Sequence, residues 1–220
     1  MELILLGLAI ILPLMAQASI SSAYNTYAKI TNTRGLTGKD VAKRILEKNG
    51  LHNVRISCIS GNLSDHYDPR YKQVNLSESI YSDDSIASLA VAAHECGHAI
   101  QDKEKYVFLN FRSALVPVVN FTSKLSTIFL FIGIVTAATK LFTVGIILLL
   151  GGLLFQLVTL PVEFNASSRA LKQLEELGLV NSKDLQGTKK VLKAAALTYV
   201  AGFLSTALQI VRLTMLNNRR

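Results

Sequence analysis

Four long apolar stretches divide the chain, and each comes close to the roughly 20 residues that an α-helix needs to cross a bilayer. They are Leu3–Ile20, Val118–Ala138, Leu141–Leu160 and Ala194–Val211. The second contains one charge, Lys124, near its start, where a long side chain can reach the interface. Small residues dilute the fourth, which fits either a membrane span or a buried or interfacial helix. The pattern therefore predicts three to four transmembrane helices.

The first stretch also has features of a secretory signal peptide. Ala16, Gln17 and Ala18 resemble a small-residue cleavage site. However, signal peptides begin with positive charge, and the one charged residue before this stretch is Glu2. Because the cationic residues come after the stretch, we expect an uncleaved N-terminal anchor over residues 1–22.

Charge is scarce and unevenly placed, which bears on topology. Charged residues make up 17% of the chain, and the net charge is +8. Of the 23 lysines and arginines, 12 lie in residues 21–113 and 6 in residues 161–193. Cytoplasmic loops carry an excess of Lys and Arg, so both regions should face the cytoplasm. This distribution accounts for the basic balance without a nucleic-acid partner, and the composition excludes a disordered chain or a disulfide scaffold.

Between the first two apolar stretches the pattern becomes that of a mixed α+β region. Thr37 and Asp40 are spaced like an N-terminal capping pair, and the helix they begin should end near residues 49–50. Alternating β-branched residues predict strands over Val54–Ile59 and Lys72–Leu76. The polar residues 64–69 between them predict a turn, so we expect a hairpin-like pair.

The next predicted helix, Ile86–Gln101, carries the main candidate chemistry. It contains the motif His94-Glu95-Cys96-Gly97-His98. Histidines at i and i+4 lie on one helical face and can bind one Zn²⁺ together, while the glutamate beside them can accept a proton from a metal-activated water. The surrounding residues are apolar, and unpaired polar groups would be costly there. We expect His94 and His98 to be metal ligands, Glu95 to be catalytic, and Cys96 to serve packing.

A catalytic zinc site takes a third protein ligand, and the strongest candidate is Glu163. It is the first carboxylate after the predicted membrane hairpin of residues 114–162, which leaves and returns on the same side. The alternative is a carboxylate that is simply solvated at the membrane exit. The two other histidines, His52 and His66, lie upstream of the motif.

Taken together, these residues resemble a known family, the YugP-type membrane zinc metallopeptidases. The resemblance covers nearly the whole chain and rests on the segments 65–70, 92–101, 160–167 and 194–200. It implies a zincin-like catalytic core related to HtpX-type membrane proteases, with Glu163 as third ligand. The family often carries Asp where this chain has Asn165, which removes a carboxylate but leaves an amide that can hydrogen-bond a ligand.

Zincins commonly hold the substrate backbone against an edge strand beside the active-site helix. Lys72–Leu76 is the candidate for that strand, and an ordinary structural edge strand is the alternative. A donor for the oxyanion is also needed. The candidates are His66, Tyr67, Arg169 and Tyr199.

The sequence thus predicts an α+β zincin-like core, mainly helical, fused to three or four transmembrane helices. The expected parts are an anchor (1–22), a cytoplasmic catalytic region (23–113), a transmembrane hairpin (114–162), a second catalytic segment with the third ligand (163–193), and a fourth transmembrane or membrane-associated helix (194–220). The expected activity is hydrolysis of peptide bonds at the cytoplasmic membrane surface with one Zn²⁺ per chain. The family resemblance implies membrane-protein quality control as its setting.

The expected partners are the lipid bilayer and a membrane-associated or unfolded polypeptide substrate, with no nucleic acid. Two rival functions stay open. A non-proteolytic membrane protein with a structural zinc normally closes its site with four protein ligands, and no fourth ligand is evident here. A transporter or channel accessory would carry ionisable residues within its spans, whereas these spans contain Lys124 alone, near an end.

Overall fold

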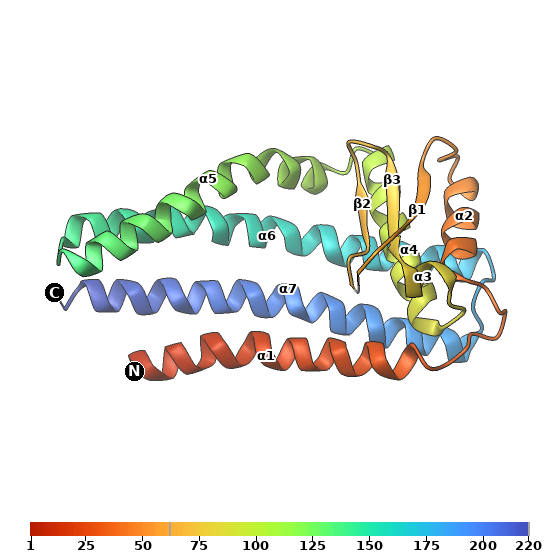
Figure 1. The fold of residues 1–220 in the computed structure, drawn as a ribbon, viewed down its shortest axis with the longest axis horizontal. Coiled ribbons are helices and arrows are strands. Elements are labelled where there is room, and N and C mark those ends of the chain that lie inside the picture. The colour runs from red at the N-terminus through yellow and green to blue at the C-terminus, as the bar shows by residue number, and fades with distance from the viewer. Residues whose placement is uncertain (62, 220) are drawn as a thin grey trace. The chain divides into compact units, whose positions relative to one another are not determined.

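The computed structural model describes residues 1–61 and 63–219, which form two compact units. The helical unit comprises Met1–Gln17, Asn110–Pro161 and the residues from Leu197 onward, and the mixed unit comprises Ala18–Leu109 and Val162–Ala196. Figure 1 labels the elements along the chain. In order they are α1 (Glu2–Tyr27), α2 (Gly38–Lys48), β1 (Arg55–Ile59), β2 (His66–Asp68), β3 (Gln73–Ser77), α3 (Glu78–Ser82), α4 (Ile86–Lys103), α5 (Val107–Val135), α6 (Thr139–Glu176) and α7 (Ser182–Asn217).

Four helices, α1, α5, α6 and α7, are long and apolar enough to cross a membrane. Each of the four predicted apolar stretches falls on one of them, including the diluted fourth stretch, which is part of α7. Large apolar side chains such as Phe131 and Val135 are two-thirds exposed, at 67% and 68%. Soluble proteins rarely show such continuous apolar surface, so these helices indicate a multi-pass membrane protein.

Within the helical unit, small residues bring α5 and α6 into close contact. A Cβ on Gly133 would lie 2.6 Å from the backbone nitrogen of Phe142, and one on Gly145 would lie 2.7 Å from Leu130. Ser126 adds a hydrogen bond across the hairpin, donating from Oγ to the carbonyl of Gly145 at 2.8 Å. Close backbone approach at small residues is the usual way in which transmembrane helices associate.

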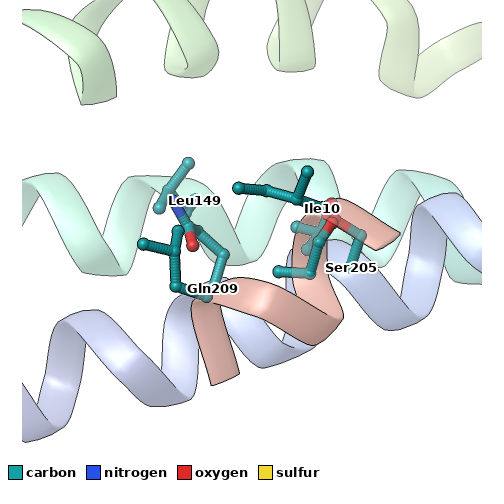
Figure 2. A pocket seen from close by; sticks show the side chains of 7 residues that line it. Ile10, Leu149, Ser205 and Gln209 are labelled. Carbon is teal, nitrogen blue, oxygen red and sulfur yellow. The ribbon is translucent and has the colours of Figure 1, made fainter. Parts of the chain in front are cut away.

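The helical unit also contains a small cavity between α1, α6 and α7 (Figure 2). Its volume is about 330 Å³, and Ile10 and Leu149 contribute apolar walls. Ser205 lines it as well, but its hydroxyl donates to the carbonyl of Ala9 and is therefore satisfied within the unit. The side chain of Gln209 supplies the amide on its wall.

The sheet of the mixed unit differs from the predicted hairpin. Its strand order is β1-β3-β2, with β1 parallel to β3 and β2 antiparallel to β3. The prediction of a hairpin between β1 and β3 is therefore wrong. Residues 66–68, which were expected to be part of a turn, form strand β2 and pair with β3. It also follows that β3, expected to be an edge strand, is the central one and has no free edge.

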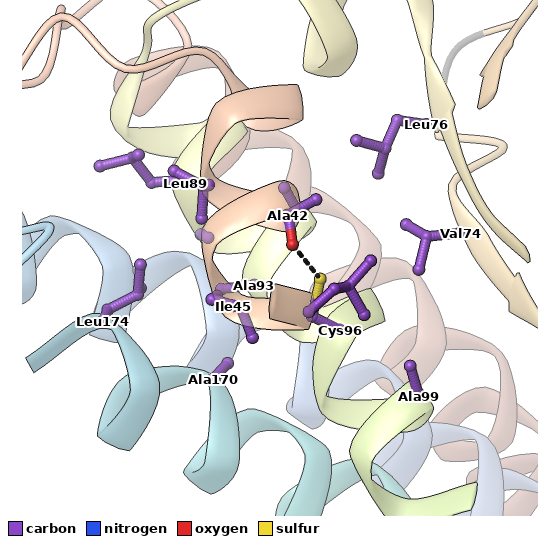
Figure 3. Packing of buried hydrophobic residues seen from close by; sticks show 14 of the residues in the cluster. Ala42, Ile45, Val74, Leu76, Leu89, Ala93, Cys96, Ala99, Ala170 and Leu174 are labelled. Atoms are coloured by element: carbon purple, nitrogen blue, oxygen red, sulfur yellow. Dashed lines mark hydrogen bonds between the residues drawn. The ribbon is translucent and has the colours of Figure 1, made fainter. Parts of the chain in front are cut away.

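The core of the mixed unit forms where α2, the sheet and the end of α6 pack around α4 (Figure 3). Ile45 of α2, Leu76 of β3 and Leu174 of α6 are fully buried in it. Cys96, on the same side of α4, donates its thiol to the carbonyl of Ala42 at 3.7 Å. Burial raises the pKa of this thiol, which stays protonated. The packing role expected for Cys96 is what the structure shows.

Side-chain caps fix where the helices of the mixed unit begin. Thr37 accepts a hydrogen bond from the backbone of Asp40, and the Asp40 carboxylate accepts from Thr37 in return, which completes the predicted capping box of α2. Ser85 caps α4 by accepting from the backbone N–H of Ser88. α5 begins at Val107, soon after α4 ends at Lys103.

Candidate metal centre

The two motif histidines lie on one face of α4, one turn apart. Their ring centroids are 4.8 Å apart, and the ring planes are nearly perpendicular at 86°. The side chains of His94 and His98 are 14% and 11% exposed. Both rings are therefore largely withdrawn from water but not fully enclosed, which suits a catalytic metal that must admit water or substrate.

Glu163 reaches the same point from α6. Its Oε2 atom lies 3.2 Å from Nε2 of His94 and 3.6 Å from Nε2 of His98, and the side chain is 3% exposed. One ligand atom from each of the three residues lies within 4.8 Å of the others. Glu163, which follows the histidines by 65 or more positions in the sequence, thus meets them as the sequence predicted. The alternative, a carboxylate solvated at the membrane exit, does not hold because Glu163 is buried.

Gly97, between the two histidines, is what permits this meeting of α4 and α6. A Cβ atom built on it would lie 2.5 Å from the carbonyl oxygen of Ala166 and 3.2 Å from its Cα. Such distances are far inside van der Waals contact, so a side chain here would force the helices apart. Ala166 lies one turn beyond Glu163, and the close approach therefore sets the distance from the carboxylate to the imidazoles.

Glu95 lies beside this group and is 8% exposed. Its electrostatic influence is visible on His98. Burial opposes the charged form of His98, but the neighbouring Glu163 carboxylate and the charge of Glu95 outweigh it, so the pKa of His98 is raised. A proton and a metal ion compete for the same imidazole nitrogen. The two nearby carboxylates favour positive charge on His98, whether it comes from a proton or from a metal ion.

Each imidazole also has a partner on the side away from Glu163. Nδ1 of His94 lies 3.2 Å from the hydroxyl of Ser167, and Nδ1 of His98 lies 3.0 Å from Oε1 of Gln101. Sequence reasoning gave these two residues no role. Gln101 could have been found from its position three residues after His98, because residues at i and i+3 share a helical face.

Two of the candidate oxyanion donors are on β2 and have partners of their own. Tyr67 donates its hydroxyl to Asp102 at 2.6 Å. Its pKa is raised by burial and by that hydrogen bond. The ring of His66 lies 3.1 Å from the amide of Asn75 and on its other side contacts the carbonyl of Ser64. Both side chains are thereby tied to the mixed unit's own framework.

The other two candidates lie on α6 and α7. Arg169, on α6, forms an ion pair with Glu104 at 2.7 Å and a hydrogen bond with Asn165. Tyr199, on α7, belongs to the helical unit. His52 is exposed and lies outside the group of potential metal ligands. The oxyanion donor therefore stays an open prediction.

The chemistry of the donor set fits zinc. Two imidazole nitrogens and one carboxylate oxygen form one of the standard sets for catalytic zinc, which leaves a position for water or substrate. Among the described residues, the group of histidine and acidic side chains arranged for a metal is His94, His98 and Glu163. A carboxylate between two imidazoles, all three nearly buried, is also costly unless a cation compensates it.

Comparisons with known proteins agree with this geometry. A family model described as "Putative neutral zinc metallopeptidase" matches residues 2–218. The chain is 42% identical over 201 residues to "Putative membrane protease YugP" of Bacillus subtilis (strain 168), which covers 91% of this chain and 89% of that relative. No solved structure gives a significant match. Zinc is the metal of this family. The comparisons confirm the resemblance to YugP-type metallopeptidases, and the chain belongs to the neutral zinc metallopeptidases described by that model.

Proposed function

We propose that this protein is a membrane-embedded zinc endopeptidase of the HExxH…E type. His94, His98 and Glu163 hold the metal, and Glu95 is the catalytic base. The observation that carries the proposal is the meeting of the three ligand atoms within 4.8 Å, with Glu95 next to them on α4. In the described part of the chain this group has three members, which favours an open catalytic site over a closed structural one.

The residues divide the work of hydrolysis in a definite order. His94, His98 and Glu163 would hold the zinc, which would supply acidification of a water molecule and polarisation of the scissile carbonyl. Glu95 accepts a proton from the attacking water while the water oxygen forms its bond to the carbonyl carbon. Glu95 then delivers that proton to the amide nitrogen as the C–N bond breaks. The near burial of Glu95 keeps bulk water from competing for that proton.

The substrate backbone is proposed to pair with β2, which replaces β3 in this role. β2 is an outer strand, paired with β3 on one side only. The hydrogen bond from Tyr67 to Asp102 fastens β2 to the end of α4, the helix that bears the histidines. Pairing through main-chain groups binds many sequences with little selectivity, which suits an unfolded or membrane-associated polypeptide.

The site is proposed to face the cytoplasm, with membrane-protein quality control as its setting. The lysines and arginines of residues 21–113 and 161–193 support this orientation, since both segments contribute to the mixed unit. Attachment to the membrane would restrict the enzyme to chains near the bilayer. A soluble unfolded protein should still be cleaved in vitro when it reaches the site.

The test of the mechanism is Glu95→Gln in the full chain purified in detergent. Cleavage of casein should fall by about 10²–10⁴-fold, because the amide cannot accept the proton. Zinc content, measured by mass spectrometry of the metal, should stay at the level of the unmutated chain, because Glu95 is not a ligand. Glu47→Gln, on the exposed face of α2, is the matched control and should change neither quantity.

Two outcomes would refute the proposal. Equal casein cleavage by Glu95→Gln and the unmutated chain would remove Glu95 from the mechanism. Unchanged zinc content in Glu163→Gln or His98→Ala would remove the ligand set. Loss of zinc in those variants together with no cleavage by any form would favour a structural zinc site.

Orientation can be tested separately with the two cysteines. Cys58 is exposed and Cys96 is buried, so a membrane-impermeant maleimide reports on Cys58 alone in the folded chain. In intact cells Cys58 should stay unlabelled until the membrane is permeabilised, and Cys58→Ser should abolish the labelling. Labelling of Cys58 from outside intact cells would contradict a cytoplasmic site.

A further inference from the structure

Gln101 is a fully buried polar side chain, three residues after the second histidine of the motif. It is 0% exposed, and both its amide nitrogen and its amide oxygen have hydrogen-bond partners. Its Oε1 lies 3.0 Å from Nδ1 of His98, and its Nε2 donates to the carbonyl of Val162 at 2.8 Å and to Oδ1 of Asn165 at 3.0 Å. A neutral amide buried this completely in a core needs such partners, because an unmade hydrogen bond there costs more than a made one gains.

The partners of Gln101 leave one orientation for its amide. The carbonyl of Val162 can only accept, so the NH₂ group must face it, and Oε1 must then face His98. Asn165 is oriented by the same logic. Its Oδ1 lies 2.7 Å from Nε of Arg169, and a guanidinium can only donate. The two amides are therefore each fixed by a group with a single hydrogen-bonding role.

This orientation determines the tautomer of His98. Because an amide oxygen can only accept, Nδ1 of the ring must carry the proton. In the neutral ring Nε2 then carries the lone pair, and Nε2 is the atom that lies 3.6 Å from the carboxylate of Glu163. The contact with Gln101 thus assigns the ring proton to Nδ1, and in the neutral ring the nitrogen that faces the other ligands is the one able to bind a metal.

His94 lacks such support. Its Nδ1 lies 3.2 Å from the hydroxyl of Ser167, which can either donate or accept. That contact is compatible with both tautomers of the ring. Of the two Nδ1 contacts, that of His98 is therefore the one made to a partner with a single hydrogen-bonding role.

The chain of hydrogen bonds continues from the core to the surface. Beyond Asn165, the Arg169 guanidinium forms an ion pair with Glu104, which follows the end of α4. The side chain of Arg169 is 23% exposed and that of Glu104 is 51% exposed. Hydrogen bonding to Arg169 lowers the pKa of Glu104, so the pair is charged at neutral pH. Arg169 is in this way held in place to orient Asn165.

We propose that Gln101 is a positioning residue that holds His98 in the Nδ1–H tautomer for zinc, and that Asn165 and Arg169 in turn hold Gln101. This inference rests on the proposed zinc site, and it adds a role that the three ligands and Glu95 do not include. Partners of this kind orient metal-binding imidazoles and raise their basicity, and their loss typically weakens metal affinity by about 10–100-fold.

The tautomer of His98 can be read directly in the zinc-free full chain, without any variant. In detergent, at a pH high enough that the histidine signals no longer change with pH, long-range ¹H–¹⁵N correlation spectra of histidine-labelled protein distinguish the two tautomers of the neutral ring. His98 should show the Nδ1–H form, and His98→Ala assigns its signals. An Nε2–H form of His98 would overturn the proposal. Because this measurement needs no change at Gln101, it holds even if a Gln101 variant fails to fold.

The second measurement is zinc affinity by competition with a chromogenic chelator. Gln101→Met keeps the approximate volume but removes the amide, and it should bind zinc about 10–100-fold more weakly than the unmutated chain. The matched control is Gln173→Met on α6, whose amide oxygen accepts from Asn49, away from the ligand atoms. It should leave zinc affinity unchanged. Equal affinity in Gln101→Met and Gln173→Met would overturn the proposal.

The role of Asn165 is tested by two replacements. Asn165→Asp keeps an oxygen that accepts from both Gln101 and Arg169, and should bind zinc as the unmutated chain does. Asn165→Leu removes the acceptor and should weaken zinc binding, by less than Gln101→Met. Equal affinity in Asp and Leu variants would remove Asn165 from the network. Absence of zinc binding in the unmutated chain would instead refute the proposed zinc site, and the His98 tautomer would still be measurable.

Discussion

The two units of this chain place their apolar side chains in opposite ways. In the mixed unit the apolar side chains point inward, so that Ile45 on α2 is fully buried. In the helical unit many of them point outward, so that Phe131 on α5 is 67% exposed. Burial from water stabilises the first kind of residue, whereas the second kind gains its free energy from lipid. A substitution of the same type should therefore have different consequences in the two units.

The polar groups of the site depend on the first arrangement. Glu163 and the histidines are placed by α4 and α6, and α4 is buried on most of its surface. A rigid apolar surrounding fixes the imidazoles and carboxylate within a few ångströms and keeps water from screening them. The outward-facing apolar side chains of the helical unit position no polar group of the site. Membrane crossing requires of them length and hydrophobicity rather than exact packing.

The largest contrast is expected from Ile45→Ala compared with Phe131→Ala. Removing the buried side chain leaves a cavity beside α4 and should destabilise the mixed unit by about 2–5 kcal/mol. Removing the exposed ring should change the stability of either unit by less than about 0.5 kcal/mol. Hydrogen exchange of α4 amides in detergent, followed by mass spectrometry, measures the local opening free energy. Similar loss of α4 protection in both variants would break the comparison between the units.

The contrast also shows which parts of the fold the sequence predicts. The four apolar helices were predictable because membrane crossing depends on composition over about 20 residues. The starts of α2 and α4 were predictable because Thr37 and Ser85 act on backbone groups within three residues. The motif on α4 was predictable for the same reason, since i and i+4 positions share a face in any helix.

Long-range pairing is what local patterns could not supply. The alternation in residues 54–59 and 72–76 indicates strands but not which strands pair, and the sequence favoured a hairpin where the structure has a parallel pair. His66–Asp68 reads as a turn because its residues favour turns, and pairing with β3 overrides that preference. Gln101 looks like a helix-end polar residue until its partners on α6 are known.

A second pair of variants compares the effect of adding a side chain at one glycine in each unit. Gly97→Ala places a Cβ against the backbone of Ala166, whereas Gly202 in the helical unit has nothing within 4 Å of its Cβ position. Gly97→Ala should destabilise the mixed unit by about 1–3 kcal/mol and weaken zinc binding, because α4 and α6 must separate. Gly202→Ala should leave both unchanged, or stabilise its helix by up to about 1 kcal/mol. Unaltered zinc affinity in Gly97→Ala would show that the α4–α6 distance does not set the site.

The smallest effect on stability is expected from the capping box of α2, a polar feature at the surface of the mixed unit. Thr37→Ala removes the hydrogen-bond acceptor for the Asp40 backbone N–H and should lower the stability of the mixed unit by about 1 kcal/mol. Asp40 gives this cap a pH dependence. Hydrogen bonds from Thr37 lower the pKa of Asp40 in the folded chain below its ordinary value. Its contribution to stability is therefore fully present above that ordinary pKa and is lost as pH falls through the lowered one.

Hydrogen exchange of α2 amides resolves this contribution, with Asp40→Asn as the control that cannot titrate. The unmutated chain should lose α2 protection more steeply than Asp40→Asn as the pH falls below about 4, after correction for the intrinsic exchange rate. Protection in α5, which has no acid in its first turn, should show no such difference between the two proteins. Parallel pH curves for α2 would mean that the carboxylate adds nothing to the cap beyond what an amide supplies.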